Sequence, residues 1–174
     1  MKYFVKFIVV TLTLLICTSS FAEQKVVVLD LKYVLNNSKA GKGAQDFLKK
    51  SFSDNQKKFA DIEKKLKEEE KDLIEKKNII SKEEYEKKAN TLRKRVIDYR
   101  SERRAAMDKI TEQRSKSRET LLKKLQPILD AHINENNISI IMDKKDFLGG
   151  KKEYDITDII IKKLNKELPS LSLK

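Results

Sequence analysis

Residues 44–126 decide the fold; they read AQDFLKKSFSDNQKKFADIEKKLKEEEKDLIEKKNIISKEEYEKKANTLRKRVIDYRSERRAAMDKITEQRSKSRETLLKKLQ. The stretch contains neither glycine nor proline, the two residues that most often interrupt a helix. Charged residues dominate it, and an apolar residue recurs every three or four positions. This pattern predicts long amphipathic helix.

One short interruption divides the stretch, at Asn78-Ile79-Ile80-Ser81. Ser81 followed by Glu84 is typical of a capping box that opens a new helix. We therefore expect one helix over about residues 44–77 and a second, running back, over about residues 82–133. At 1.5 Å per residue these helices span roughly 50 and 80 Å, longer than any core that this chain could build around them. The sequence predicts a projecting antiparallel hairpin.

Heptad spacing indicates which residues pair the two helices. Several of these positions are polar, small or charged, so the seam packs more weakly than a zipper of leucine and isoleucine. We expect a hairpin that can splay and bend, with a rigid coiled-coil spacer as the alternative. The predicted seam comprises Leu48, Phe52, Asn55, Phe59, Ile62, Leu66, Glu69, Leu73 and Lys76 on the first helix, and Ala89, Leu92, Val96, Tyr99, Arg103, Ala106, Ile110, Gln113 and Ser117 on the second.

The first 22 residues are typical of a cleaved signal peptide. Lys2 and Lys6 precede an apolar run, and Ser20-Phe21-Ala22 places small residues where a signal peptidase reads. We expect cleavage after Ala22 and export to the periplasm. The only cysteine, Cys17, would leave with the signal, so the exported chain would have neither disulfides nor thiolate chemistry.

The chain is strongly basic. It has 39 Lys and Arg against 27 Asp and Glu, a net charge of +12 that falls to +10 without the two signal-peptide lysines. Such a charge favours anionic partners, of which export makes nucleic acid the least expected. Residues 93–124 hold twelve basic and five acidic residues, which indicates either a solvated helix face or a surface for clients or anionic lipid. The candidate binding residues are Arg93, Lys94, Arg95, Arg100, Arg103 and Arg104.

The two ends of the chain carry the strand signals. Residues 25–29 and 138–142 are rich in β-branched residues and predict two buried strands, and Phe147-Leu148 predicts part of a third. Asp30 is expected to cap a short helix through Leu35, and residues 38–43 to form a loop. Asp155 or Thr157 is expected to cap a last helix over about residues 158–168, with Ile156, Ile159, Ile160 and Leu164 as its buried stripe.

These parts predict an α+β protein, mostly α, in which a long helical hairpin is inserted between the strands of a small body. The body would comprise residues 23–43 and 127–174, the arm residues 44–126. A body of this size buries too little surface to be stable alone, and exposed strand edges favour pairing with further copies. The residues expected in this oligomerisation body include Val26, Val27, Val28, Leu29, Ile138, Ile140, Ile141 and Ile156.

No pattern for catalysis, a metal or a cofactor is evident. The single histidine, His132, lies near the end of the second helix, where packing is its usual role. The Gly41-Lys42 pair lacks the earlier glycine and the hydroxyl residue of a phosphate-binding loop. We therefore expect a binding protein and not an enzyme.

The order of these parts resembles the OmpH/Skp family of periplasmic chaperones for outer membrane proteins. The similarity rests on the opening KVVVLD at residues 25–30, the charged hairpin, the closing ISIIMD at residues 138–143, and Asp155-Ile156-Thr157 before the last helix. The resemblance implies a homotrimer with a β-barrel body and three arms enclosing a cavity. Unfolded outer membrane β-barrel proteins would be held there without ATP, and basic arm residues would bind lipopolysaccharide. A structural spacer and a binder of anionic lipid surfaces in the cell envelope remain as alternatives.

Overall fold

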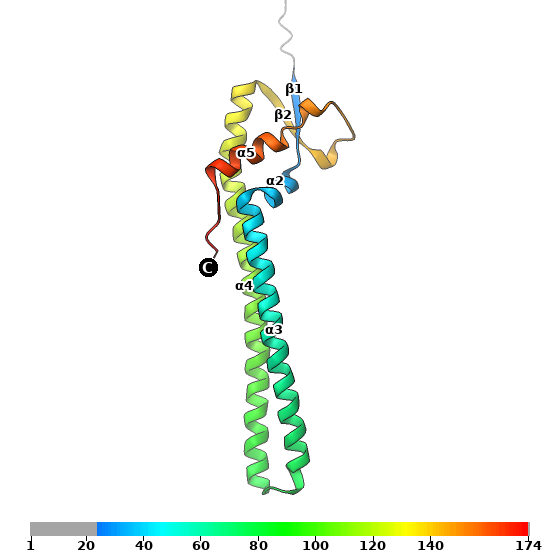
Figure 1. The fold of residues 1–174 in the computed structure, drawn as a ribbon, viewed down its shortest axis with the longest axis vertical. Helices are drawn as coiled ribbons and strands as arrows, with labels where there is room; N and C mark the ends of the chain where they lie inside the picture. Colours follow the sequence, from blue (N-terminus) through cyan, green and yellow to red (C-terminus); the bar gives the residue numbers. More distant parts are fainter. Residues whose placement is uncertain (1–23, 174) are drawn as a thin grey trace, which may run out of the picture.

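The computed structural model describes residues 24–173, so the predicted signal peptide lies outside the described residues. A small body lies at one end, and two long helices project from it as an arm (Figure 1). The elements, in chain order, are β1 (Lys25–Leu29), α2 (Leu31–Asn37), α3 (Lys39–Glu75), the 3-10 turn η1 (Lys76–Asn78), α4 (Lys82–Asn136), β2 (Ile138–Asp143), the 3-10 turns η2 (Lys144–Asp146) and η3 (Lys152–Tyr154), and α5 (Thr157–Glu167).

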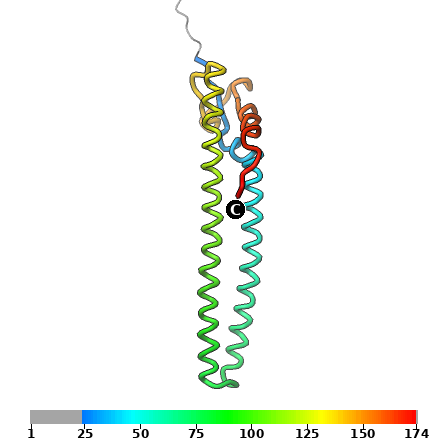
Figure 2. Tube along the Cα trace, turned by 90° about the vertical axis from the view of Figure 1, so that its left-hand side faces the viewer, coloured from blue at the N-terminus to red at the C-terminus, as the bar shows by residue number. Residues whose placement is uncertain are grey.

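Helices α3 and α4 form the predicted antiparallel hairpin, and they lie side by side in both views (Figures 1 and 2). The turn between them follows the predicted signals. The N–H of Ile79 donates to the carbonyl of Lys76 at 2.9 Å, and the Ser81 hydroxyl accepts from the N–H of Glu84 at 3.2 Å. Ser81 therefore caps α4 as expected.

Helix α3 begins earlier than predicted, because residues 39–43 are helical and do not form a loop. The Ser38 hydroxyl accepts from the N–H of Gly41 at 3.2 Å, and the Asn165 side-chain oxygen accepts from the N–H of Lys39 at 2.6 Å. A Cβ at Gly41 would lie 1.9 Å from the carbonyl oxygen of Leu35. This glycine does not break the helix but allows α2 to approach α3 closely.

The body is built on a two-stranded parallel sheet of β1 and β2. The register runs from Lys25 opposite Ile138 to Leu29 opposite Asp143, with an irregularity at the first pair. The whole arm is thus the crossover of one very long β-α-β unit. On its other side β1 makes a single parallel bridge, from Val28 to Asp155.

The predicted strand at Phe147-Leu148 is absent from the described structure, so that prediction was wrong. Phe147 instead ends the η2 turn, donating its N–H to the carbonyl of Lys144 at 3.2 Å. Its ring occupies the space that a side chain at Gly150 would need, since a Cβ there would lie only 2.4 Å from the ring. The segment is therefore a loop stabilised by an aromatic ring packed on glycine.

Both helices that border the body differ from prediction by a few residues. Helix α4 continues through Pro127 and ends at Asn136, where Asn137 takes the left-handed conformation with φ 51°. Helix α5 begins at Thr157, whose N–H donates to the Asp155 carboxylate at 3.0 Å. The Thr157 hydroxyl accepts instead from the N–H of Asp30, at 2.9 Å, and so joins α5 to the end of β1.

The hydrophobic core lies in the body and in the base of the arm. Residues spaced four apart on α5 face inward, so Ile156, Ile160 and Leu164 are buried as predicted, whereas Ile159 is 46% exposed. The buried cluster comprises Val27, Leu29, Val34, Leu35, Ala40, Leu121, Leu125, Ile128, Ile138, Ile156, Ile160 and Leu164. The fold class predicted from the sequence is confirmed: a mostly helical protein in which the hairpin lies between the strands of a small sheet.

Candidate functional site

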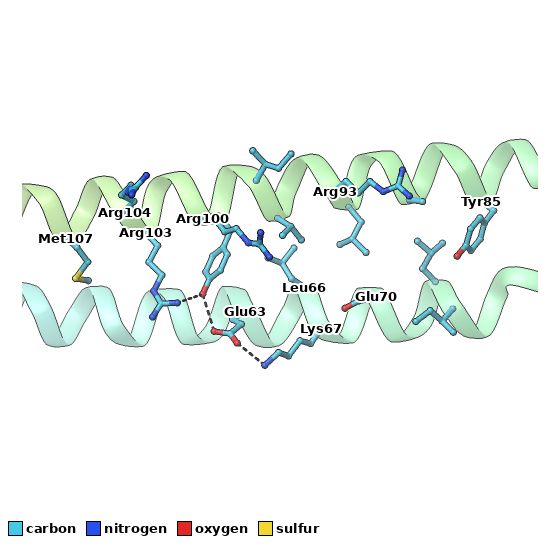
Figure 3. Close-up of a pocket in the computed structure, with 17 residues that line it drawn as sticks. Glu63, Leu66, Lys67, Glu70, Tyr85, Arg93, Arg100, Arg103, Arg104 and Met107 are labelled. Atoms are coloured by element: carbon cyan, nitrogen blue, oxygen red, sulfur yellow. Dashed lines mark hydrogen bonds and ion pairs between the residues drawn. The ribbon is translucent and has the colours of Figure 1, made fainter.

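A groove of about 1130 Å³ runs between α3 and α4 in the half of the arm that lies far from the body (Figure 3). It exists because the seam weakens there, as the heptads predicted. Glu69 and Lys76 occupy seam positions but are charged and exposed, so they add no buried apolar contact between the helices. The lining residues are Glu63, Leu66, Lys67, Glu70, Leu73, Ile74, Tyr85, Ala89, Leu92, Arg93, Val96, Ile97, Tyr99, Arg100, Arg103, Arg104 and Met107.

The floor of the groove is apolar. Leu66 and Leu73 from α3 are buried, and Leu92 and Val96 from α4 are half-buried. A small residue on α4, Ala89, does not reach far enough to cover them. Side chains that stay partly exposed in the seam of a hairpin leave apolar surface for a third polypeptide segment.

Two isoleucines at the rim extend this apolar surface. Ile74 on α3 is 60% exposed and Ile97 on α4 is 65% exposed. The sequence analysis named neither residue as a candidate for this site. Each directly follows a seam residue, Leu73 and Val96 respectively, and a widened apolar stripe of this kind was the available signal.

Four of the predicted basic residues line the groove and two do not. Arg93, Arg100, Arg103 and Arg104 border it, while Lys94 is exposed elsewhere on α4. Arg95 forms an ion pair with Glu69 across the hairpin. These positions leave the binding role of the six residues a prediction.

Tyr99 ties the two helices together at one end of the groove. Its hydroxyl donates to the Glu63 carboxylate at 3.1 Å and accepts from Arg103 at 3.4 Å (Figure 3). Its ring meets Phe59 edge-on, with centroids 6.0 Å apart. Sequence spacing placed Tyr99 in the seam, but could not show that it bonds Glu63.

The charges around Tyr99 are mutually compensated. The hydrogen bond from Lys67, 2.8 Å from Glu63, and then that from Tyr99 lower the pKa of the Glu63 carboxyl. The same pairing raises the pKa of Lys67. Glu63 therefore stays charged and holds Lys67, while within residues 24–173 neither Arg100 nor Arg104 has a carboxylate within 4.0 Å. These two guanidinium groups are available to an external anion.

Two residues that were predicted to lie in the seam nearer the body are exposed, so the prediction was wrong for them. Phe52, expected in the seam, is 48% exposed and lines a smaller depression beside Phe59. Arg103 is also exposed, because its guanidinium reaches to the Tyr99 hydroxyl at the helix surface. Phe59, Ile110, Gln113 and Ser117 are buried or nearly so, as expected of seam residues.

The sheet residues named from the sequence divide into buried and exposed ones. Val27, Val28, Leu29, Ile138 and Ile156 are buried. Val26 and Ile141 are half-buried, whereas Ile140 is 51% exposed, and Met142 beside it is 37% exposed. Among the described residues β2 pairs only with β1, so its other edge is open.

No helix in the range 24–173 is long and apolar enough to cross a membrane. In the same range no group of three or more His, Cys, Asp or Glu is placed to hold a metal ion.

Comparison with known proteins places this architecture. The model of a family described as "Outer membrane protein (OmpH-like)" matches residues 25–164. A "Skp-like protein" from Pseudomonas aeruginosa is 24% identical over 170 residues, covering 95% of this chain and 99% of that protein. A crystal structure of an OmpH-like protein from Caulobacter crescentus, provisionally assigned as an outer membrane chaperone, superposes with a TM-score of 0.78 at 18% identity. The superposition covers 87% of this chain and 89% of the Caulobacter chain.

The chain is thus a protein in which a small body with a two-stranded sheet carries one long α-helical hairpin. The chain belongs to the OmpH family, since the matched region includes both strands, the entire arm and most of α5. The resemblance drawn from the sequence is confirmed.

Proposed function

We propose that the chain is an ATP-independent holdase chaperone of the periplasm that keeps unfolded outer membrane β-barrel proteins soluble. The observation that carries this proposal is the arm groove, where an apolar floor lies beside free guanidinium groups on a hairpin that projects from the core. Membership of the OmpH family and the description of the Caulobacter protein as an outer membrane chaperone support it.

The groove suits a chain that has not folded. Leu66, Leu73 and Leu92 would contact apolar side chains of the client, and Arg100 and Arg104 would pair with its carboxylates. Each such contact is weak and partly exposed to water, so it exchanges quickly. Several arms acting on one client would still hold it tightly, because linked weak sites raise the effective concentration.

Assembly into a homotrimer is part of the proposal. The open edge of β2 presents unpaired backbone groups, and Ile140 and Met142 expose apolar surface on the same strand. Pairing of this edge with another copy would cover both. Light scattering should give the mass of three subunits for the wild type, and a smaller mass for the variant Ile140→Lys/Met142→Lys. A wild-type chain that is monomeric at all concentrations would contradict the assembly.

Client capture is tested by diluting a urea-unfolded outer membrane β-barrel protein into buffer with and without the chain. At low salt and without nucleotide, light scattering from client aggregates should fall when the chain is present. Added salt should weaken the protection, since guanidinium–carboxylate attraction is screened over about 10 Å at 0.1 M salt. Unchanged aggregation at low salt would refute the proposal.

Matched variants locate the site. The double variant Arg100→Glu/Arg104→Glu should lose protection, whereas Lys94→Glu/Lys109→Glu reverses two charges on the same helix outside the groove and should retain it. Ile74→Ser/Ile97→Ser should also lose protection, and Ile159→Ser, an exposed isoleucine of the body, should not. Equal losses in a groove variant and its control would show that the groove is not the site.

The client-aggregation assay and a vesicle-binding assay together separate the alternatives. A structural spacer would bind no unfolded client under any condition. A binder of lipopolysaccharide or of an anionic membrane surface would bind vesicles of phosphatidylglycerol or lipopolysaccharide with an affinity set by salt, and would be indifferent to the folding state of a protein client.

A further inference from the structure

His132 occupies a buried junction of three elements of the body. It lies one turn before the end of α4, is only 6% exposed, and has the start of β1 and the side of α5 as neighbours. It is also the only histidine in the chain. The arm groove is lined by residues in the half of the arm far from the body, so the following inference does not rest on the proposed function.

The hydrogen bonds around the ring assign its proton. The side-chain amide nitrogen of Asn136 lies 2.9 Å from the backbone carbonyl of His132, to which it can only donate. The same nitrogen lies 3.0 Å from Nδ1 of His132, so it donates to that atom as well. Nδ1 must therefore be a bare acceptor, and the neutral ring carries its proton on Nε2.

Charged groups face the ring from each neighbouring element. Lys25 of β1 donates its ammonium to the carbonyl of Asn136 at 3.4 Å, and Lys163 of α5 pairs with Glu135 of α4 at 2.7 Å. Burial and then the positive charge of Lys163 lower the pKa of His132 below 6.5; the negative charge of Glu135 partly opposes them, and Lys25 adds a still smaller lowering effect. The site thus already contains two cations and one anion.

We propose that His132 is a proton-operated switch that loosens the body where α4 ends and β2 begins. A proton on Nδ1 would point at the amide N–H of Asn136, so Asn136 would have to turn away and give up both of its bonds to His132. Asn136 is the last residue of α4, and only Asn137 separates it from β2. Acidification therefore acts directly on the strand that carries the open edge of the sheet.

The sign of the effect follows from the direction of the pKa shift. Because the folded protein prefers the neutral ring, the stabilisation is complete above the unfolded value of 6.5 and is lost as the pH falls through the folded pKa. Each unit between the two pKa values lowers the ratio of folded to unfolded protein about tenfold at acid pH.

Nuclear magnetic resonance of the single imidazole tests the proposal in the full exported chain. We expect the ring to titrate below 6.5 in the folded protein and near 6.5 in urea, with nitrogen shifts of the Nε2–H form at neutral pH. After correction for the intrinsic pH dependence of exchange, the protection of amides in residues 133–141 should decrease as the pH falls below 6.5 and through the folded pKa of His132. A folded pKa at or above 6.5, or an Nδ1–H tautomer, would overturn it.

Variants distinguish a switch from a merely buried ring. Asn136→Ala removes the donor to Nδ1 and should raise the pKa of His132 towards 6.5, and Lys163→Gln should raise it by removing a neighbouring cation. His132→Gln cannot be protonated, so the protection of these amides, corrected for intrinsic exchange, should change less with pH than in the wild type. Should His132→Gln not fold, the wild-type titration and the two pKa variants still decide, and unchanged values in both would refute the proposal.

Discussion

Two glycines near the start of α3 allow the packing of α2 on the arm to be measured. A methyl group at Gly41 would place its Cβ 1.9 Å from the carbonyl oxygen of Leu35 and 2.9 Å from the Ser38 hydroxyl oxygen, both far inside van der Waals contact. At Gly43, in the same helix, a Cβ would meet nothing within 4 Å. The substitutions Gly41→Ala and Gly43→Ala therefore differ only in what surrounds the new methyl group.

The expected difference can be worked out from this geometry. Each substitution gains the same helix propensity, roughly 1 kcal/mol for alanine over glycine, so this gain cancels between the two variants. Gly41→Ala alone must push α2 away from α3, and overpacking of this kind costs about 1–3 kcal/mol. We expect Gly43→Ala to be more stable than the wild type and Gly41→Ala to be less stable than Gly43→Ala by about 1–3 kcal/mol.

Urea unfolding followed by far-UV circular dichroism measures this difference. The protein concentration must be held constant, because assembly would make the midpoint depend on it. With an unchanged slope, a lower midpoint for Gly41→Ala than for Gly43→Ala reports the packing cost. Equal midpoints would mean that α2 does not lie against the first turn of α3, and the explanation of the early start of α3 would fail.

Two further predictions concern the base of the arm and the body. Leu125→Ala should cost about 2–5 kcal/mol of unfolding free energy, since Leu125 is 1% exposed, whereas Leu122→Ala, at 36% exposed, should cost less than about 1 kcal/mol; similar midpoints in urea for the two variants would contradict the assigned core. Burial raises the pKa of Asp155, but the hydrogen bonds from Lys144 and Thr157 outweigh it and leave the pKa below 3.8, so this stabilisation is present above pH 3.8 and is lost as the pH falls through the folded value. In acid titrations of thermal stability Asp155→Asn should fall less steeply than the wild type below about pH 4, and an identical acid limb would show that Asp155 contributes nothing there.

The arm could be predicted because its signals are local. The absence of Gly and Pro from residues 44–126 and the Ser81 cap depend only on neighbours in sequence. Propensity and capping act over one or two turns, so they do not need the rest of the fold. The open seam followed from Glu69 and Lys76, which are charged residues at pairing positions.

The errors arose where distant parts of the chain decide the local structure. Gly41 signals a loop by itself, but the cap from Asn165 on α5 and the contact with α2 make the segment helical. Phe147 has the propensity of a strand residue, yet its ring packs on Gly150. Tertiary contacts of this kind override propensity and cannot be seen in a short window.

The groove could be predicted only in part from the sequence, because distant parts of the chain form it. Counting charges identified the arginines as candidates. The pairing of α3 with α4 decides which of them line the groove, and it places Arg95 in an ion pair with Glu69. The bond between Tyr99 and Glu63 spans 36 residues of sequence, so no local pattern encodes it.

The arm is a crossover whose two ends return to the same place, and this makes its reach independent of the body. Strand β1 enters α3 through α2, and α4 leads straight into β2, so both strands lie at one end of the hairpin. Deleting one heptad from each helix at facing positions would shorten the arm by roughly 10 Å and leave the strand register as it is. Evolution can therefore change the length of the arm without changing the sheet or the core of the body.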